Sequence, residues 1–293
     1  MRFFSFTAEG RRGLALATPG GYRGCLEGEA GWPGDLDTLL REDRLAEAAT
    51  ALAACGPVDQ GDVTPALPFN RADKVLCVGL NYADHAAESK METPPFPTVF
   101  ARFNSNLIAH GANLVRPAAS EMFDYEGELV AVIGKPGRAI PKERALDHVA
   151  GYTIFNDGSI RDFQLRTNQW TVGKNFDGTG AMGPVFVTAD ELPPGAAGLR
   201  LTTRVNGQVL QDASTSLLIF SVADLVSMLS IGMELRPGDL IVTGTPSGVG
   251  MARDPKVFLR PGDTCEVEIE RIGILSNPVV AEEDESRKAL SAA

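Results

Sequence analysis

The chain has 293 residues, enough for one large domain or for one domain with a smaller companion. Hydrophobic residues make up 44% of it, and 31 glycines and 19 prolines indicate a globular protein rich in turns and strands, which excludes a helical bundle and a disordered chain. The formal net charge of -11 excludes a general affinity for nucleic acid or an anionic membrane, so an anionic ligand would need positive charge placed locally.

The cysteines and the N-terminus bear on the cellular setting. The four cysteines are scattered without a C-x-x-C pair, which favours neither a zinc site nor a disulfide framework, so a reducing cytoplasm is expected. Charged residues interrupt the N-terminal segment too early for the apolar region of a secretory signal peptide. No apolar stretch approaches the roughly 20 residues that a membrane span needs. We therefore expect a cytoplasmic protein without a membrane segment.

Residues 1 to about 70 contain no pattern that carries recognisable chemistry. Short strand-like pieces precede a run of apolar residues at helical spacing, and one helix is predicted over residues 36–54. The helix stops near Gly56 and Pro57, and an extended, proline-containing link follows it. We expect residues 1–70 to form a small N-terminal domain.

A buried strand predicted over residues 74–80 leads into a short helix over residues 81–88. His85 and Glu88 are three residues apart on one face of that helix, where a carboxylate can orient an imidazole and raise its basicity. The chain has only three histidines. An ordinary surface histidine is the alternative for His85, and the sequence of this helix alone leaves both interpretations open.

Two glutamates, Glu126 and Glu128, stand at the head of the apolar run 129–133. If that run is a strand, alternation sends both side chains to the same face of the sheet. Two like charges in a partly dry cleft favour a cation between them, and oxygen ligands suit magnesium, manganese or calcium. Residues 152–158 are predicted to form a strand that leads into a turn, and Asp157 at the end of this strand would supply a third carboxylate. Solvated glutamates on an exposed strand end are the competing interpretation.

Lys174 follows the carboxylates and lies among small and apolar residues. A partly desolvated ammonium there could stabilise developing negative charge, and a solvated lysine is the alternative.

Residues 178–183 match the letters of the G-x-G-x-x-G motif. Pro184 comes next, and residues 185–187 are strand-like where a helix should begin, so we reject a dinucleotide fingerprint.

The last third of the chain contains a predicted hairpin, a helix and a polar loop. The Asn-Gly pair at 206–207 favours a tight hairpin turn, and a sequence resembling a capping box begins a helix at Ser221. The loop 243–250 lies between two predicted strands and could bring backbone amides and the Thr245 hydroxyl to an anionic ligand. The charged tail, residues 281–293, is expected to fray.

Together these motifs resemble the fumarylacetoacetate hydrolase family over roughly residues 71–280. Five ordered segments carry the resemblance, and any one of them alone would be a weak signal. They are residues 81–85, 125–129, 151–157, the Gly-Lys-Asn-Phe-Asp sequence around Lys174, and 243–250.

The resemblance implies an α+β fold and a set of site residues. The fold would be a mixed β-sheet roll over 71–280 as the catalytic domain, with a small N-terminal α+β domain, usually in a homodimer. The implied cofactor is Mg²⁺ or Mn²⁺, with Ca²⁺ as a non-physiological occupant. The implied roles are metal ligation by Glu126, Glu128 and Asp157, water activation by His85 and Glu88, charge stabilisation by Lys174, and substrate binding by Arg161, Gln164 and Thr245.

The resemblance is greatest to the acylpyruvate-cleaving branch of the family. The implied reaction is hydrolysis of a carbon–carbon bond in a 2,4-dioxo acid, which gives pyruvate and a carboxylic acid. His85, held by Glu88, would deprotonate water, and the pyruvate enolate would form where the metal and Lys174 concentrate positive charge. A metal-dependent decarboxylase or tautomerase of an oxo-diacid such as oxaloacetate would use the same enolate, and this alternative stays open. A non-catalytic, metal-stabilised binding module is the alternative outside enzymes.

The expected partner is a small anionic 2-oxo acid, and neither nucleic acid nor a membrane is expected. The acyl portion of the substrate cannot be read from these motifs.

Overall fold

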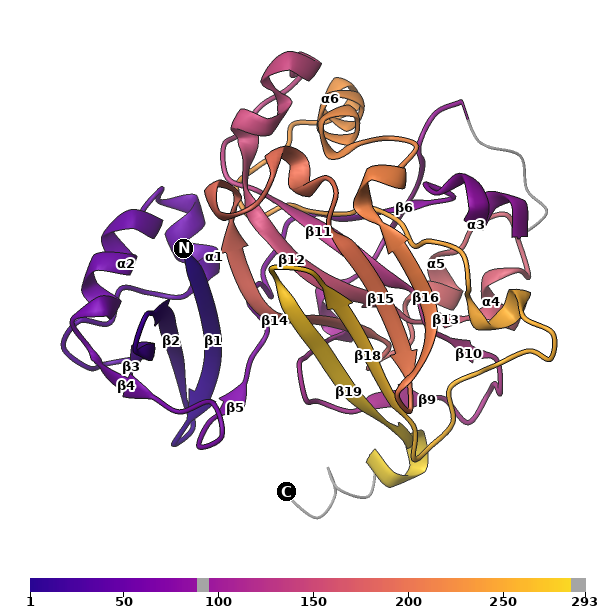
Figure 1. Ribbon diagram of the computed structural model, residues 1–293, viewed down its shortest axis with the longest axis horizontal. Coiled ribbons are helices and arrows are strands. Elements are labelled where there is room, and N and C mark those ends of the chain that lie inside the picture. The colour runs from indigo at the N-terminus through magenta and orange to yellow at the C-terminus, as the bar shows by residue number, and fades with distance from the viewer. Residues whose placement is uncertain (89–94, 286–293) are drawn as a thin grey trace.

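Two β-sheets form the frame of the molecule, and short helices lie around them (Figure 1). The computed structural model describes residues 1–88 and 95–285. The larger sheet has 12 strands and the smaller has five. The larger sheet is mixed, since most neighbours pair antiparallel whereas β17 runs parallel to β6 and β8 parallel to β14. The α+β fold with a mixed sheet, expected from the sequence, is confirmed.

The larger sheet has the hydrogen-bonded order β4 (Gly56–Val58), β3 (Gly21–Leu26), β2 (Arg11–Thr18), β1 (Arg2–Ala8), β14 (Gly180–Thr188), β12 (Val149–Asp157), β11 (Gly127–Ile133), β17 (Leu240–Val242), β6 (Val75–Gly79) and β7 (Thr98–Ala101). Two further strands join it off this path, β5 (Thr64–Pro65) beside β1 and β8 (Leu107–Ala109) beside β14. The smaller sheet has the order β16 (Gln208–Ser214), β15 (Arg200–Val205), β18 (Thr264–Ile269), β19 (Gly273–Ala281) and β9 (Leu114–Arg116). A separate pair is formed by β10 (Phe123–Asp124) and β13 (Ser159–Ile160).

The helices are short. The α-helices are α1 (Leu36–Arg41), α2 (Leu45–Ala53), α3 (Ala83–Glu88), α4 (Arg161–Gln164), α5 (Thr171–Lys174) and α6 (Val222–Gly232). The 3₁₀ turns are η1 (Asn104–Asn106), η2 (Lys142–His148), η3 (Ala189–Glu191), η4 (Pro194–Ala196), η5 (Thr215–Leu217) and η6 (Gly250–Ala252). None of the described helices has the length and apolar character that crossing a bilayer requires.

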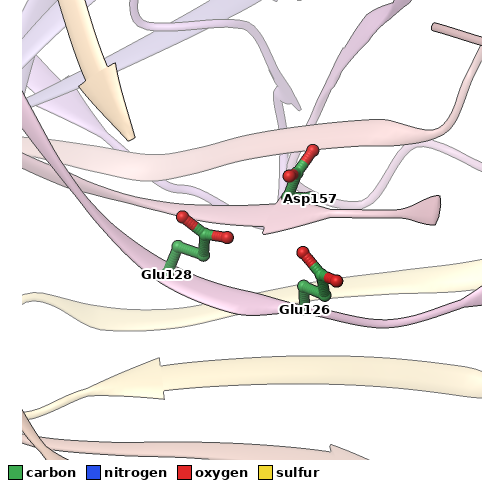
Figure 2. A group of neighbouring side chains, drawn as sticks. All are labelled: Glu126, Glu128 and Asp157. Carbon is green, nitrogen blue, oxygen red and sulfur yellow. The ribbon is translucent and has the colours of Figure 1, made fainter. Parts of the chain in front are cut away.

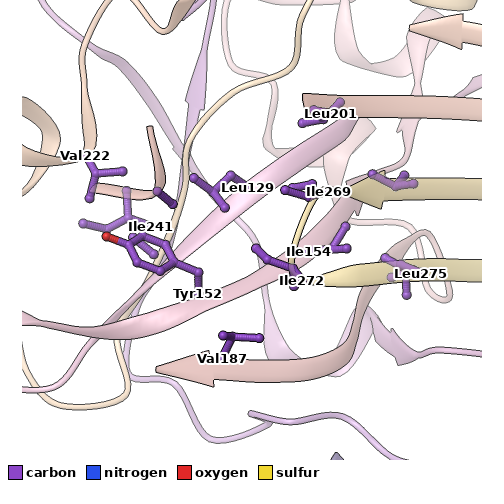
Figure 3. Close-up of a cluster of buried hydrophobic side chains, with 14 of the residues drawn as sticks. Leu129, Tyr152, Ile154, Val187, Leu201, Val222, Ile241, Ile269, Ile272 and Leu275 are labelled. Atoms are coloured by element: carbon purple, nitrogen blue, oxygen red, sulfur yellow. The ribbon is translucent and has the colours of Figure 1, made fainter. Parts of the chain in front are cut away.

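The apolar run of β11 is buried on both faces of the large sheet. Leu129 belongs to the core between the two sheets, where it lies with Ile154 of β12 and Ile269 of the smaller sheet (Figure 3). Val130 and Val132 point the other way, into a second core that includes side chains of α1 and α2. The sequence of a strand that is covered on both faces is a continuous run of apolar residues, and residues 129–133 have this pattern.

The predicted single helix over residues 36–54 is wrong, because the chain breaks it into α1 and α2. Asp43 has φ 53°, which lies outside the helical region, and the Arg44 backbone N–H donates to the Leu39 carbonyl at 2.9 Å. This turn lets Leu40 of α1 and Leu52 of α2 enter the same core. The run of four charged residues at 41–44 offers no apolar side chain that would favour continuing one amphipathic helix.

Other local predictions are confirmed. Asn206 and Gly207 have φ values of 51° and 79° and join β15 to β16, and Ser221 forms a complete capping box at the start of α6. Residues 180–188 form strand β14 where a dinucleotide site would need a helix, so the rejection of that fingerprint holds. All four cysteines are free thiols.

The N-terminal segment is hydrogen-bonded into the large sheet, since β1 pairs with β14. The division of the chain near residue 70 stays a prediction. In the tail, Glu282 accepts a hydrogen bond from the Ala118 backbone N–H and Glu285 accepts one from Asn113, both at 2.8 Å. The remainder of the predicted frayed tail, residues 286–293, lies outside the described residues.

Phe186→Ala is expected to lower the free energy of unfolding by about 3–5 kcal/mol. Phe186 of β14 is fully buried and joins the N-terminal segment to the sheet, with ring centroids 6.3 Å from Phe3 and 5.2 Å from Phe69. Urea denaturation measures the loss. Ile231→Ala is the control, since that side chain is 63% exposed, and equal effects of the two substitutions would contradict the prediction.

Candidate active site

Three carboxylates meet at the ends of two neighbouring strands. Glu126 immediately precedes β11, Glu128 is the second residue of β11, and Asp157 ends β12. Glu128 pairs with Phe155 in the antiparallel register, so Glu126 lies opposite Asp157, whose backbone N–H donates to the Glu126 carbonyl at 2.8 Å. All three side chains are buried, and one carboxylate oxygen from each lies within 4.8 Å of the others (Figure 2). The alternation predicted for the glutamates therefore turns both toward Asp157.

Buried side chains of opposite charge follow one another through this region in a row, which we call the charge row. In order of contact its members are Asp124, Arg161, Glu126, Lys174, Asp157 and Arg102. The ion pairs between neighbours measure 2.5 to 2.8 Å. Three carboxylates and three cations make the row neutral, which is the condition for burying so many charges together.

Charges within the row outweigh the effect of burial on its pKa values. Burial raises the pKa of Glu126, but the charges of Lys174 and Arg161 more than reverse this and lower that pKa to about 2. Burial lowers the pKa of Lys174, but the charges of Asp157 and Glu126 raise it above its ordinary value. Both side chains are therefore charged at neutral pH.

Glu128 lies beside the charge row without a cation of its own. Its Oε2 accepts a hydrogen bond from the Gly244 backbone N–H at 2.5 Å, and among the described side chains no basic group forms an ion pair with it. Burial, reinforced by the charges of Asp157 and Glu126, raises the pKa of Glu128 well above its ordinary value. A divalent cation held by oxygens of the three carboxylates would remove this imbalance, and hard oxygen donors of this kind can bind such an ion.

His85 and Glu88 of α3 form the pair that their spacing predicts. Glu88 Oε1 lies 2.9 Å from His85 Nδ1, and Glu88 Oε2 accepts a hydrogen bond from the Gly248 backbone N–H at 2.9 Å. An ionised carboxylate only accepts hydrogen bonds, so this contact places a proton on Nδ1 of the imidazole, and in the neutral ring Nε2 is the nitrogen with the free lone pair. His85 lines the same pocket as Glu126 and Glu128.

Arg161 and Gln164, both in α4, also line this pocket. Arg161 donates through Nε to Asp124 at 2.8 Å, and through Nη1 it contacts Glu126 at 2.6 Å and donates to Gln164 Oε1 at 2.9 Å. Its Nη2 is buried and has no hydrogen-bond partner among the described residues. Asp124 and Glu126 thus fix the guanidinium and leave one N–H₂ group for a ligand.

The loop over residues 243–250 connects several parts of the site. The Thr245 hydroxyl donates to the Gly127 carbonyl at 3.1 Å and accepts from Gln211 Nε2 at 2.8 Å, so it is held by protein groups while it lines the pocket. Gly244 has φ 107°, and a Cβ at this residue would lie 2.8 Å from the Asn81 side chain. Only glycine fits this bend, which aims the Gly244 N–H at Glu128.

The rest of the pocket lining is apolar. Its side chains are Val78, Leu80, Phe100, Leu165, Trp170, Val249 and Met251. A Cβ at Gly79 would lie 2.2 Å from the Trp170 ring, so that glycine makes room for the indole. Of the predicted site residues, Glu88 and Asp157 do not line the pocket, but each contacts one that does, His85 and Lys174 respectively.

Sequence reasoning missed Asp124, Arg102 and Trp170. Asp124 belongs to the acidic segment that precedes β11, and it also accepts hydrogen bonds from the backbone N–H groups of Gly250 and Met251 at 2.8 and 2.9 Å. Arg102 follows β7 and is flanked by apolar residues, which is the signal that could have revealed a buried cation. Nothing in the sequence around Trp170 distinguishes it from a core aromatic residue.

Comparisons with known proteins identify the family of this chain. A family model described as the fumarylacetoacetate (FAA) hydrolase C-terminal domain matches residues 74–280. The human protein named oxaloacetate tautomerase FAHD2A, mitochondrial (Homo sapiens) is 43% identical over 242 residues, which are 82% of this chain and 77% of that protein.

Two solved structures extend the comparison. Fumarylacetoacetate hydrolase from Exiguobacterium antarcticum has a TM-score of 0.85 at 35% identity and covers 96% of this chain and 100% of its own. Fumarylpyruvate hydrolase from Pseudomonas aeruginosa, solved in complex with Mn²⁺ and pyruvate, has a TM-score of 0.66 at 36% identity and covers 77% of this chain and 93% of its own. The family match spans more than half of the chain and includes His85, the three carboxylates and Lys174, so the chain belongs to the fumarylacetoacetate hydrolase family.

Proposed function

We propose that this protein is a divalent-metal-dependent enzyme that transforms a small 2-oxo acid through its enol or enolate. The observation that carries the proposal is a single pocket lined by Glu126, Glu128, Lys174 and His85. Asp157 completes the carboxylate triad beside the pocket, and Glu88 contacts His85 from outside it. The charge row is neutral. A bound divalent cation would favour the ionised form of Glu128, and the sum of their charges would be one positive charge. The carboxylate of a 2-oxo acid neutralises that charge, which supports an anionic substrate.

The first candidate reaction is the keto–enol tautomerisation of an oxo-diacid such as oxaloacetate. The human relative with that name, 43% identical to this chain, favours it. His85 Nε2 would exchange a proton with the carbon next to the oxo group while Glu88 holds the ring, and Lys174 would stabilise negative charge on the oxo oxygen. A divalent cation held by Glu126, Glu128 and Asp157 would supply Lewis acidity to the bound 2-oxo acid. One proton moves between carbon and oxygen, and no carbon–carbon bond breaks.

The second candidate is the hydrolysis of a 2,4-dioxo acid, favoured by the His85–Glu88 pair and by the resemblance to fumarylpyruvate hydrolase. His85 would take a proton from water, and the resulting hydroxide would attack the distal carbonyl carbon. The carbon–carbon bond then breaks, its electron pair forms the enolate of pyruvate beside Lys174, and the proton on His85 returns to that carbon. The products are a carboxylic acid and pyruvate.

A substrate panel tests the proposal and separates the candidates. Protein freed of metal and reloaded with Mg²⁺ or Mn²⁺ is given oxaloacetate in its enol form and a series of 2,4-dioxo acids, with enzyme-free controls. Faster ketonisation of oxaloacetate without pyruvate indicates the tautomerase. Pyruvate from the dioxo acids indicates the hydrolase, and pyruvate with carbon dioxide from oxaloacetate indicates the decarboxylase. Absence of all three with either metal contradicts the proposed function.

The identity of the resident metal, the oligomeric state and the cellular location belong to the same proposal. We propose Mg²⁺ or Mn²⁺, a homodimer and a cytoplasmic location. The relative solved with Mn²⁺ supports the metal, whereas several relatives, including the human protein, are named as mitochondrial. Metal analysis, light scattering and cell fractionation measure the three properties.

Glu128→Gln is expected to raise the melting temperature of the metal-free protein and to abolish the further rise that Mn²⁺ causes in the wild type. Because burial raises the pKa of Glu128, the metal-free protein must either protonate this carboxyl or bury it without a cation. The neutral amide avoids that cost, but it cannot supply an anionic oxygen ligand. Thermal unfolding with and without Mn²⁺ measures both effects. Glu268→Gln is the control, because that carboxylate pairs with Arg204 and is 39% exposed. A Mn²⁺-dependent rise that persists in Glu128→Gln would remove this residue from the metal site.

His85→Asn is expected to slow turnover by about 100-fold or more and to leave the Mn²⁺-dependent rise in melting temperature unchanged. The imidazole contacts Glu88 and lines the pocket, but His85 does not belong to the group of three residues that could hold the metal ion. Steady-state kinetics and thermal unfolding measure the two properties. His148→Asn serves as the matched control, since His148 contacts the Lys135 carbonyl away from the pocket. Wild-type turnover by the His85 variant would exclude its role as the base.

A further inference from the structure

Arg102 is the last cation of the charge row and does not line the pocket. Its side chain is fully buried. Nη1 lies 2.5 Å from Asp157 Oδ1 and donates to the Gly158 carbonyl at 3.1 Å, and Nη2 donates to the Thr179 hydroxyl at 2.8 Å. A planar guanidinium that makes three such contacts is fixed in one orientation.

The contact with Arg102 determines how Asp157 presents its carboxylate. Asp157 Oδ1 is held by Arg102, and Oδ2 is held by Lys174 Nζ at 2.7 Å. Two cations on two oxygens fix the rotation of the carboxylate plane about the Cβ–Cγ bond. We propose that Arg102 is a positioning residue that aims Asp157 at a divalent cation shared with Glu126 and Glu128, an inference that rests on the proposed function.

Two neighbouring residues of the sheet, Gly180 and Phe155, border the Arg102 guanidinium. A Cβ at Gly180 would lie 2.8 Å from Nη2 and 2.9 Å from Cζ of Arg102, so the glycine provides the space that the guanidinium occupies. The Cζ atom lies 5.5 Å from the centre of the Phe155 ring. Gly180 pairs with Asp157 in the register of β12 and β14. The sheet therefore places the aspartate and the space for its arginine on adjacent strands.

Variants that conserve charge separate orientation from electrostatics. Without the positive charge of Arg102, the triad would attract a divalent cation more strongly. Loss of the orientation of Asp157 would instead weaken binding of the cation. A neutral substitution of Arg102 would therefore combine two opposite effects. Arg102→Lys keeps the charge, but a single ammonium cannot reach Asp157, Gly158 and Thr179 in the geometry of the fork. Gly180→Ala leaves Arg102 itself unchanged and displaces its guanidinium.

The experiment measures Mn²⁺ affinity rather than activity. Metal-free wild-type protein, Arg102→Lys and Gly180→Ala are titrated with Mn²⁺, and the free ion is followed by electron paramagnetic resonance. We expect both variants to bind Mn²⁺ about 10-fold more weakly or worse. Lys74→Met is the matched control, because Lys74 pairs at 2.7 Å with the buried Asp239, which does not line the pocket. It should lower the melting temperature and leave Mn²⁺ affinity within about twofold of wild type.

The outcomes distinguish this inference from the proposed function. If the wild type does not bind Mn²⁺, the proposed function fails and the role of Arg102 fails with it. If the wild type binds Mn²⁺ and both variants bind it equally well, the positioning role alone is overturned. An equal loss of affinity in Lys74→Met overturns it as well, because the effect would then reflect general destabilisation. Should Arg102→Lys not fold, Gly180→Ala decides the question by itself.

Discussion

The burial of charge is the constraint on which the site depends. Taking an unpaired carboxylate or ammonium group out of water costs several kcal/mol, on the order of the net stability of a domain. Six charged side chains from Asp124 to Arg102 alternate in sign, so each has a neighbour of opposite charge that offsets this cost. Glu128 is the exception, and its imbalance is the physical reason to expect a divalent cation beside it. The alternation that offsets the cost of burying these charges thus also forms the site.

One loop ties the parts of this site together through its backbone. The Gly244 N–H donates to Glu128, the Gly248 N–H to Glu88, and the Gly250 N–H to Asp124. The carboxylate triad, the histidine pair and the charge row therefore share one support. Loop backbone amides bind carboxylates well because each N–H must be satisfied when it is buried. A shift of this loop would alter all three groups at once, so the elements of the site are coupled rather than independent.

The two candidate reactions need the same charged groups and differ in what the rest of the pocket admits. Both develop negative charge on a 2-oxo oxygen near Lys174, and both use a base at the position of His85. The hydrolysis also requires room for a water molecule beside the distal carbonyl, whereas the tautomerisation does not. The apolar side of the lining, which includes Phe100, Trp170 and Met251, is where the acyl portion of a substrate would lie. Discrimination between substrates is therefore expected to depend on these side chains rather than on the metal ligands.

Features that arise from local geometry were predictable from the order of the residues alone. The alternation of a strand placed Glu126 and Glu128 on one face, and the pitch of a helix brought His85 next to Glu88. The turn at residues 206–207 and the cap at Ser221 were likewise readable, since their chemistry acts over a few residues. The order of the motifs likewise indicates the family, which needs no knowledge of tertiary contacts.

Which distant charges meet depends on how the whole chain folds. Arg102 contacts Asp157 across 55 positions in sequence, and Arg161 contacts Asp124 across 37. The pairing of β11, β12 and β14 sets these neighbours, and strand register is not encoded in any single segment. The break between α1 and α2 has the same origin, because packing of Leu40 and Leu52 into one core outweighed the helical periodicity of the run. Local patterns follow from backbone geometry, whereas the partners of buried charges follow from the packing of the whole chain.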